Sequence, residues 1–154
     1  MNTAFVLNFA ARPLILACFF TCVAGLLAAQ AQATSTLNPS DRIAIRATVQ
    51  AQLKAIHAND ADGAFAYATV ELQRKVGSPD AFMQMIRESY EPVYQPRAVF
   101  FQDARLMEGV ATQHVLFMDQ NGAPVKALYS MQRQSDGTWR INGCMLYRGD
   151  ARVL

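Results

Sequence analysis

Cysteine and charged residues are scarce in this sequence. The chain of 154 residues contains three cysteines, only 17% of its residues are charged, and its formal net charge is +2. Because neither sign of charge is gathered into a run, the chain lacks the basic surface that nucleic-acid-binding proteins use. Eight glycines and six prolines exclude a collagen-like or low-complexity chain, and a hydrophobic content of 52% excludes disorder as the main state. The length suits one ordinary domain.

The first 33 residues have the pattern of a signal peptide. An apolar run over residues 14–29 follows the basic Arg12 and precedes Ala31-Gln32-Ala33, which fits the small-x-small site of signal peptidase. The run is shorter than the roughly 20 residues that span a bilayer, and no basic stop-transfer cluster follows it. We therefore expect cleavage after Ala33 and a periplasmic or secreted domain with no stable membrane anchor. A retained N-terminal anchor is the alternative.

Cleavage at this site leaves Cys144 as the single cysteine of the mature chain. One cysteine cannot form a disulfide within the chain, so the fold must depend on its core even in an oxidising compartment. Zinc sites that need paired cysteines are excluded, and the two histidines are not spaced as ligands. No metal or cofactor is expected. Cys144 also has no clear basic neighbour, so a reactive thiolate is not indicated.

Residues 34–40 are expected to be a short linker, and three helices to open the domain over residues 41–148. Asn38-Pro39-Ser40-Asp41 combines an N-cap residue with proline in the first turn. The helix that follows has an apolar stripe at Ile45, Val49, Leu53 and Ile56. Asp60 begins a second, shorter helical region, which ends at Gly77. Ser78-Pro79-Asp80 begins a third helix, which ends at Glu91-Pro92 because proline disfavours a helical residue before it.

From Arg97 onwards the apolar period changes to two, which predicts strands over residues 98–107, 111–119, 124–134 and 138–148. The connections Glu108-Gly109, Asn121-Gly122 and Ser135-Asp136-Gly137 are short, so neighbouring strands should be antiparallel. The sequence therefore predicts an α+β domain in which three N-terminal helices pack on one face of a four-stranded antiparallel meander. Residues 149–154 form a C-terminal tail.

The loop lengths also predict which residues lie opposite each other. A two-residue Glu108-Gly109 turn pairs Asp103 with His114, and a two-residue Asn121-Gly122 turn pairs His114 with Tyr129. A three-residue loop over 135–137 pairs Met131 with Ile141 and Arg133 with Trp139, and Gly143 beyond Tyr129 leaves space or a bulge. The face covered by the helices then carries Phe101, Leu116, Met118, Met131, Trp139, Ile141, Met145 and Tyr147.

The same registers leave an apolar patch on the other face of the sheet. An uncovered apolar patch usually marks an interface, and a self-complementary one most often closes as a two-fold dimer. We therefore expect a homodimer, and the alternative cover for this patch is the C-terminal tail. The residues of the predicted interface are Val115, Phe117, Leu128, Cys144 and Leu146.

Several motifs carry a resemblance to known families. Three helices followed by a bent meander that ends in Asp136-Gly137-Thr138-Trp139-Arg140-Ile141 resemble the nuclear-transport-factor-2-like superfamily. More narrowly, the stretches 90–94, 113–115, 131–141 and 142–144 (YEPVY, QHV, MQRQSDGTWRI and NGC) resemble a bacterial family known as domain of unknown function 4864. The resemblance covers about residues 43–146. It implies a cone-shaped fold with a curved sheet, a homodimeric tendency and a pocket between helices and sheet, and it implies no particular activity.

Asp103, His114 and Tyr129 form the candidate site in the predicted registers. Steroid-isomerase-like relatives use a carboxylate or histidine base with a tyrosine that donates to the developing oxyanion, and an apolar cone shifts the pKa values of such groups. The alternative, which we favour, is a buried Asp103–His114 pair that only stabilises the fold. The expected lining of the pocket is Tyr90, Tyr94, Asp103, Arg105, Thr112, His114, Tyr129 and Met131.

Two functions from different classes follow from these residues. The favoured one is a non-catalytic binding or interaction module that holds a small apolar molecule. The alternative is a cofactor-independent isomerase or lyase that uses Asp103, His114 and Tyr129. An open pocket that exposes both Asp103 and His114 favours the enzyme, and a filled core favours the binding module.

Overall fold

A computed structural model describes residues 37–148 of the chain. The expected signal peptide with its cleavage site and the expected tail lie outside the described residues. No helix within residues 37–148 is both long and apolar enough to cross a membrane. The elements, in chain order, are α1 (Pro39–His57), α2 (Ala61–Ala66), α3 (Val70–Val76), α4 (Pro79–Ser89), α5 (Glu91–Tyr94), β1 (Ala98–Met107), β2 (Val110–Met118), β3 (Pro124–Arg133) and β4 (Trp139–Tyr147).

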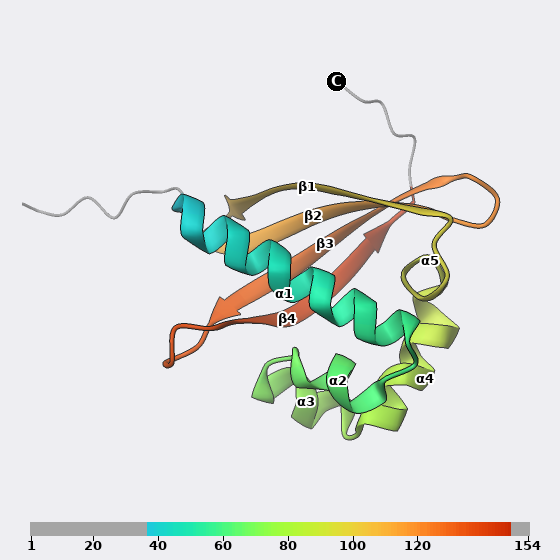
Figure 1. Ribbon diagram of the computed structural model, residues 1–154, viewed down its shortest axis with the longest axis horizontal. Coiled ribbons are helices and arrows are strands. Elements are labelled where there is room, and N and C mark those ends of the chain that lie inside the picture. The colour runs from blue at the N-terminus through green and yellow to red at the C-terminus, as the bar shows by residue number, and fades with distance from the viewer. Residues whose placement is uncertain (1–36, 149–154) are drawn as a thin grey trace, which may run out of the picture. The chain divides into compact units, whose positions relative to one another are not determined.

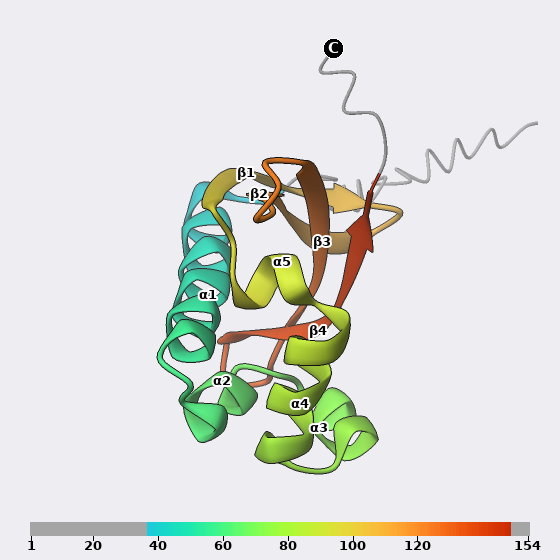
Figure 2. The same cartoon turned by 90° about the vertical axis from the view of Figure 1, so that its right-hand side faces the viewer.

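The four strands form one antiparallel sheet in the order β1-β2-β3-β4. The helix α1 runs across one face of this sheet, and α2, α3 and α4 gather near the C-terminal end of α1 (Figure 1). A view turned by a quarter-turn shows α1, α4 and α5 on the same side of the sheet (Figure 2). The predicted α+β class and the antiparallel four-stranded meander are therefore confirmed.

The number of helices differs from the prediction, because five are present among the described residues where three were expected. The region between Asp60 and Gly77 holds two short helices, since the Thr69 hydroxyl accepts a hydrogen bond from the Leu72 N–H at 3.2 Å and begins α3. Beyond the third predicted helix, Pro92 occupies the first turn of the one-turn helix α5. The side-chain cap at Thr69 thus divides the second predicted helical region, whereas α5 begins without a side-chain cap.

The first helix forms as its sequence predicts. The side chain of Asn38 accepts a hydrogen bond from the Asp41 N–H at 2.7 Å, and Pro39 lies in the first turn. The four residues of the apolar stripe, Ile45, Val49, Leu53 and Ile56, are all buried against the sheet. The Asp41 carboxylate also accepts a hydrogen bond from the Trp139 indole N–H at 3.1 Å, which joins the start of α1 to β4.

The connection between β2 and β3 is one residue longer than predicted. The Asp119 N–H donates to the Ala123 carbonyl at 3.0 Å, so the loop contains residues 120–122 rather than Asn121-Gly122 alone. As a result Tyr129 pairs with Gln113, and His114 pairs with Leu128. A shift of one residue turns every side chain of one strand to the other face relative to its partner. The predicted pairing of His114 with Tyr129 is therefore wrong.

The turn between β1 and β2 has the predicted length, and Met107 pairs with Val110. Glu108 and Gly109 have φ values of 51° and 82°, which suit the type I′ turn of a two-residue hairpin. The predicted register is interrupted further along, because a bulge between Phe101 and Ala104 inserts an extra residue into β1. This bulge removes the predicted pairing of Asp103 with His114.

The hairpin between β3 and β4 has the predicted register near its loop, with Met131 opposite Ile141 and Arg133 opposite Trp139. A bulge then shifts β4 between Ile141 and Gly143, so that Cys144 rather than Gly143 lies opposite Tyr129. The sequence indicated space or a bulge beside Gly143, and the structure places the extra residue at Asn142.

Because of these register changes, many side chains lie on the opposite face of the sheet from the one that the sequence predicts. Phe101, Met131, Trp139 and Ile141 lie on the helix side as predicted, whereas Leu116, Met118, Met145 and Tyr147 lie on the other face. Conversely, four residues of the predicted dimer interface lie on the helix side: Val115, Phe117, Cys144 and Leu146. Of the predicted interface residues, only Leu128 remains on the face away from the helices, hereafter the outer face.

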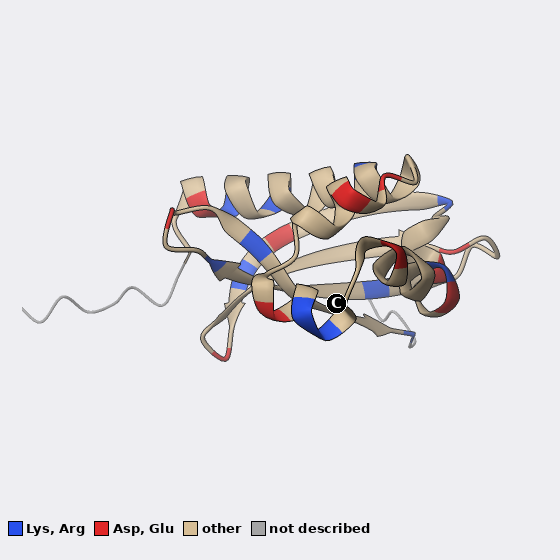
Figure 3. Ribbon diagram, turned by 90° about the horizontal axis from the view of Figure 1, so that it is seen from below, with Lys and Arg blue, Asp and Glu red and all other residues tan. Residues whose placement is uncertain are grey.

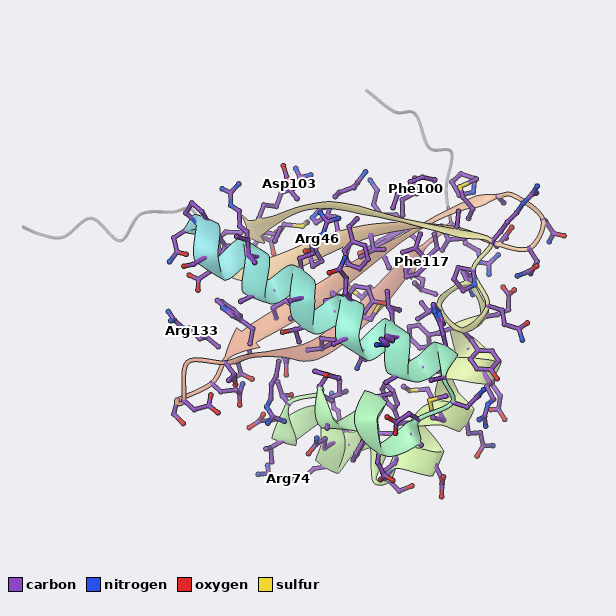
Figure 4. The ribbon with its side chains drawn as sticks, viewed as in Figure 1. Arg46, Arg74, Phe100, Asp103, Phe117 and Arg133 are labelled. Atoms are coloured by element: carbon purple, nitrogen blue, oxygen red, sulfur yellow. The ribbon has the colours of Figure 1, made fainter. Side chains whose placement is uncertain are left out.

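Two phenylalanines test the observed register directly. Phe117 is fully buried beneath the helices, whereas Phe100 is 54% exposed on the outer face (Figure 4). We expect Phe117→Ala to lower the free energy of unfolding by about 3–5 kcal/mol and Phe100→Ala to lower it by about 0.5 kcal/mol or less. Urea denaturation of the two variants provides the measurement. Equal losses would show that β2 has the opposite face toward the helices.

Candidate functional site

The three candidate catalytic residues, Asp103, His114 and Tyr129, do not form one site. Tyr129 is 2% exposed and lies on the helix side of β3, while His114 lies on the outer face of β2. Asp103 is exposed within the bulge of β1 (Figure 4). Because the sheet separates His114 from Tyr129, a base and a hydroxyl donor at these two positions cannot act on one bound molecule.

His114 also lacks the predicted carboxylate partner. Its Nε2 lies 3.1 Å from the Met107 sulfur, and no described acid forms an ion pair with it. Burial lowers the pKa of His114, and the positive charges of Arg105 and Lys126 lower it further. His114 is therefore a neutral imidazole among cations, and the predicted Asp103–His114 pair is not formed.

The other residues of the predicted pocket are divided in the same way. Arg105 and Thr112 lie opposite each other on the outer face. Met131 lies in the core, and the Tyr94 hydroxyl donates to the Asn59 side chain at 2.9 Å near the end of α1. Tyr90 and Tyr129 are the predicted residues that line a common cavity, together with residues that the sequence did not single out.

This cavity lies between the helices and the sheet and has a volume of about 220 Å³. Its apolar wall comes from four helices and β4, and it reaches the surface beside the exposed residues Lys75 and Asn142. The apolar lining residues are Ile56, Leu72, Phe82, Met85, Ile86, Val93 and Ile141. The remaining lining residues are Gln52, Lys75, Tyr90, Tyr129, Asn142, Gly143 and Cys144.

The bulge of β4 shapes one wall of this cavity. The segment between α2 and α3 lies along the edge of β4, where the Ile141 N–H donates to the Tyr67 carbonyl at 2.9 Å. The Thr69 N–H in turn donates to the Ile141 carbonyl at 2.9 Å, and the Thr69 hydroxyl donates to the Asn142 side chain at 3.0 Å. These contacts hold the bulge, and the bulge sets Cys144 beside Tyr129 on the cavity wall.

Most polar groups of the cavity wall already have a partner within the domain. The Gln52 amide donates to the Ala64 carbonyl at 3.2 Å, and the Tyr90 hydroxyl donates to the Cys144 carbonyl at 3.1 Å. The Tyr129 hydroxyl is the exception. It is buried, the neighbouring Cys144 thiol offers it only a weak sulfur acceptor, and no described group meets it in good hydrogen-bonding geometry. Buried hydroxyl groups in proteins are normally hydrogen-bonded, so this one calls for a ligand or a solvent molecule as its partner.

Two titratable groups of the wall, Tyr129 and Cys144, are held neutral. Burial raises the pKa of the Tyr129 hydroxyl well above its usual value, and the neighbouring Cys144 raises it further. Although the residue Cys144 is only half-buried, its thiol faces the interior, and burial raises its pKa to about 12. At neutral pH Tyr129 is thus a hydrogen-bond donor and Cys144 an unreactive thiol.

The wall of the cavity offers hydrogen-bond donors but no base. Its lining includes no Asp, Glu or His, and Lys75 is the charged group at its mouth. Within residues 37–148, no three His, Cys, Asp or Glu side chains are grouped to hold a metal ion. The donors on this wall can hold a molecule that carries hydrogen-bond acceptors.

The sequence could not single out this lining from apolar periodicity alone. Phe82 and Ile86 were expected on the third helix, but nothing in their spacing distinguishes a core contact from a cavity wall. The sequence predicts the wrong face for Cys144, because the bulge at Asn142 exchanges the faces of the β4 side chains that follow it. The available indication was Gly143, whose position in a strand suggested a bulge.

Two tyrosines on the cavity wall make a matched pair of substitutions. Tyr129→Phe removes a hydroxyl without a partner, so we expect the free energy of unfolding to stay constant or to rise by about 1 kcal/mol. Tyr90→Phe removes a hydrogen bond to the Cys144 carbonyl, so we expect a loss of about 0.5–1.5 kcal/mol. Chemical denaturation measures both. A larger loss for Tyr129→Phe than for Tyr90→Phe would show that the Tyr129 hydroxyl is paired.

Comparison with known proteins identifies the domain that carries this cavity. The sequence profile of the family described as Domain of unknown function (DUF4864) matches residues 38–152. No curated protein shows significant similarity to the chain. The match spans every helix and strand described above and most of the chain. The chain therefore belongs to the DUF4864 family.

Proposed function

We propose that this domain is a non-catalytic binding module that holds a small, largely apolar molecule in the cavity between its helices and its sheet. The observation that carries the proposal is the Tyr129 hydroxyl, which is buried on the cavity wall without a partner. An unsatisfied buried polar group costs about 1–3 kcal/mol, and a ligand acceptor that receives its hydrogen bond recovers that free energy on binding.

The size and lining of the cavity support the same function. An apolar cavity of about 150 Å³ is large enough to take up benzene, and the cavity here has about 220 Å³. Ligand sites are typically apolar with a few placed polar groups, which describes this wall. Basic and acidic residues are interspersed along the helices and strands (Figure 3), which supports a small molecule rather than a nucleic acid as the partner.

The resemblance to the nuclear-transport-factor-2-like superfamily belongs to this proposal as well. Helices packed on one face of a sheet that two bulges bend, with a cavity between the layers, support a cone-shaped fold of that type.

Export of the domain is a further part of the proposal and depends on the first 33 residues of the sequence. Protein recovered from the periplasmic fraction of a bacterial host is expected to begin at Thr34. N-terminal sequencing provides the check, and a mature protein that still begins at Met1 would contradict it.

Binding in the cavity can be tested with a larger side chain that fills it. Leu72 lines the cavity from α3, while Val70 on the same helix is exposed and does not line it. A small aromatic ligand such as para-methylacetophenone should raise the melting temperature of the wild type, because binding to the folded state stabilises it. We expect Val70→Trp to retain this rise and Leu72→Trp to lose it. A rise that persists in Leu72→Trp would place the ligand elsewhere.

We also propose that a second copy of the chain covers the outer face of the sheet. Large apolar side chains are exposed on this face, namely Phe100, Met107, Val110, Met145 and Tyr147. Asp103 is exposed at its edge, and the exposed cations Arg105 and Lys126 lie on the same face. None of these three charges forms an ion pair among the described residues. A two-fold arrangement can bring the acid of one copy to a cation of the other.

The dimer proposal has a matched control on the helix side. Met145 is 59% exposed on the outer face, and Ile43 is 71% exposed on α1. We expect Met145→Glu and Leu128→Glu to sediment as monomers at tens of micromolar, because each buries a charge in the interface. Ile43→Glu should sediment as the wild-type dimer does. A monomeric wild type under the same conditions would overturn the proposal.

A further inference from the structure

The cavity offers a ligand two polar positions, and they differ in depth. The Tyr129 hydroxyl lies at the buried end, where its residue is 2% exposed, and has no partner. Lys75 lies at the exposed mouth, at the end of α3. The Lys75 ammonium forms no ion pair with an acid of the described residues. Most of the side chains between these two positions are apolar.

The other polar side chains of the wall are already engaged. Gln52 donates to a backbone carbonyl, Tyr90 does the same, and the Asn142 side-chain oxygen accepts from Thr69. These bonds fix how the three side chains lie, although the Gln52 oxygen and the Asn142 amide nitrogen make no hydrogen bond among the described residues. Tyr129 at the buried end and Lys75 at the mouth are both donors that favour an acceptor on the ligand, and Lys75 also favours a negative charge.

From this arrangement we infer that the ligand of the cavity is a small amphipathic carboxylate. Its carboxylate lies at Lys75, its apolar body lies among Ile56, Phe82 and Ile86, and a neutral acceptor such as a carbonyl oxygen receives a hydrogen bond from Tyr129. This inference rests on the proposed binding function, and it adds the chemical class and the orientation of the ligand.

The orientation follows from the cost of burying charge. A carboxylate at the deep end would lose its hydration and meet only a neutral hydroxyl, which does not compensate the loss. At the mouth it keeps part of its hydration and has a cation beside it. A neutral carbonyl loses less on burial and gains the hydrogen bond that Tyr129 lacks. The reverse orientation is therefore disfavoured at both ends.

Three aromatic probes separate the two interactions. The first is para-acetylbenzoate, which carries a carboxylate and a carbonyl acceptor at opposite ends of the ring. In para-isopropylbenzoate an alkyl group of similar shape replaces the acetyl group and removes the acceptor. In para-methylacetophenone a methyl group replaces the carboxylate. Dissociation constants are measured by isothermal titration with the wild type and with three variants: Tyr129→Phe, Lys75→Met and Lys126→Met.

The expected pattern is specific to each interaction. Tyr129→Phe should weaken the binding of both carbonyl compounds about tenfold and leave para-isopropylbenzoate unchanged, since one neutral hydrogen bond is lost. Lys75→Met should weaken both carboxylates about threefold to fivefold, as expected for a partly exposed ion pair, and leave the neutral ketone unchanged. Lys126→Met is the matched control for the charge change. Because Lys126 lies on the outer face, away from the cavity, this variant should leave the affinity for all three probes unchanged even if it weakens self-association.

The results distinguish a wrong ligand class from a wrong binding function. If Lys75→Met resembles Lys126→Met, or if Tyr129→Phe weakens para-isopropylbenzoate as much as the ketone, the inferred ligand class is wrong although the cavity binds. If none of the three probes binds the wild type, the binding function itself is overturned.

Discussion

The register between β2 and β3 determines the interior of this domain, and the carboxylate of Asp119 sets that register. Asp119 is buried at the end of β2, and its Oδ1 accepts hydrogen bonds from the N–H groups of Asn121 and Ala123, each at 2.9 Å. These two bonds hold residues 119–123 as one compact connection. A tighter turn at Asn121-Gly122 would bring the opposite face of β2 to the helices. Because of Asp119, the side chains of Gln113, Val115 and Phe117 lie inside.

The two bulges depend on this register, and each is stabilised by a specific contact. The bulge in β1 frees the Gln102 carbonyl from the ladder, and the buried Gln113 amide donates to it at 2.6 Å. The bulge in β4 leaves Ile141 at the edge of the sheet, where its N–H and carbonyl bond to Tyr67 and Thr69. Bulges bend a strand and re-aim its side chains. Here the bulge in β4 turns Cys144 inward beside Tyr129, where both line the cavity.

Features for which the local sequence favours a single conformation could be predicted. Features for which it offers two competing conformations, or which depend on distant contacts, could not. The cap at Asn38, the stripe of α1 and the Glu108-Gly109 turn depend on residues within one or two turns of chain, and all three are present. The β2–β3 register depends on the side chain of Asp119 competing with a favourable Asn121-Gly122 turn. Both connections satisfy local rules. The hydrogen bonds that the Asp119 carboxylate accepts from the Asn121 and Ala123 N–H groups decide between them.

The candidate site was missed for the same reason. Tyr90 and Tyr129 are both among the residues that the sequence predicts for the pocket, and both line the cavity. His114 and Asp103 were assigned beside Tyr129 through the two registers that the Asp119 loop and the β1 bulge change. Lys75 and Asn142 reach the cavity through the packing of α3 on β4, which no local pattern of the sequence describes.

The sheet also separates the two surfaces on which the proposals rest. The cavity, with Tyr129, Cys144 and the mouth at Lys75, lies on the helix side, whereas the exposed apolar side chains of Phe100 and Met145 lie on the outer face. A second copy seated on the outer face would leave the mouth open. Substitutions on the two sides share no contact among these residues, so their free energies should add. The proposed ligand binding and the proposed self-association therefore involve opposite faces of one small sheet and can be tested separately.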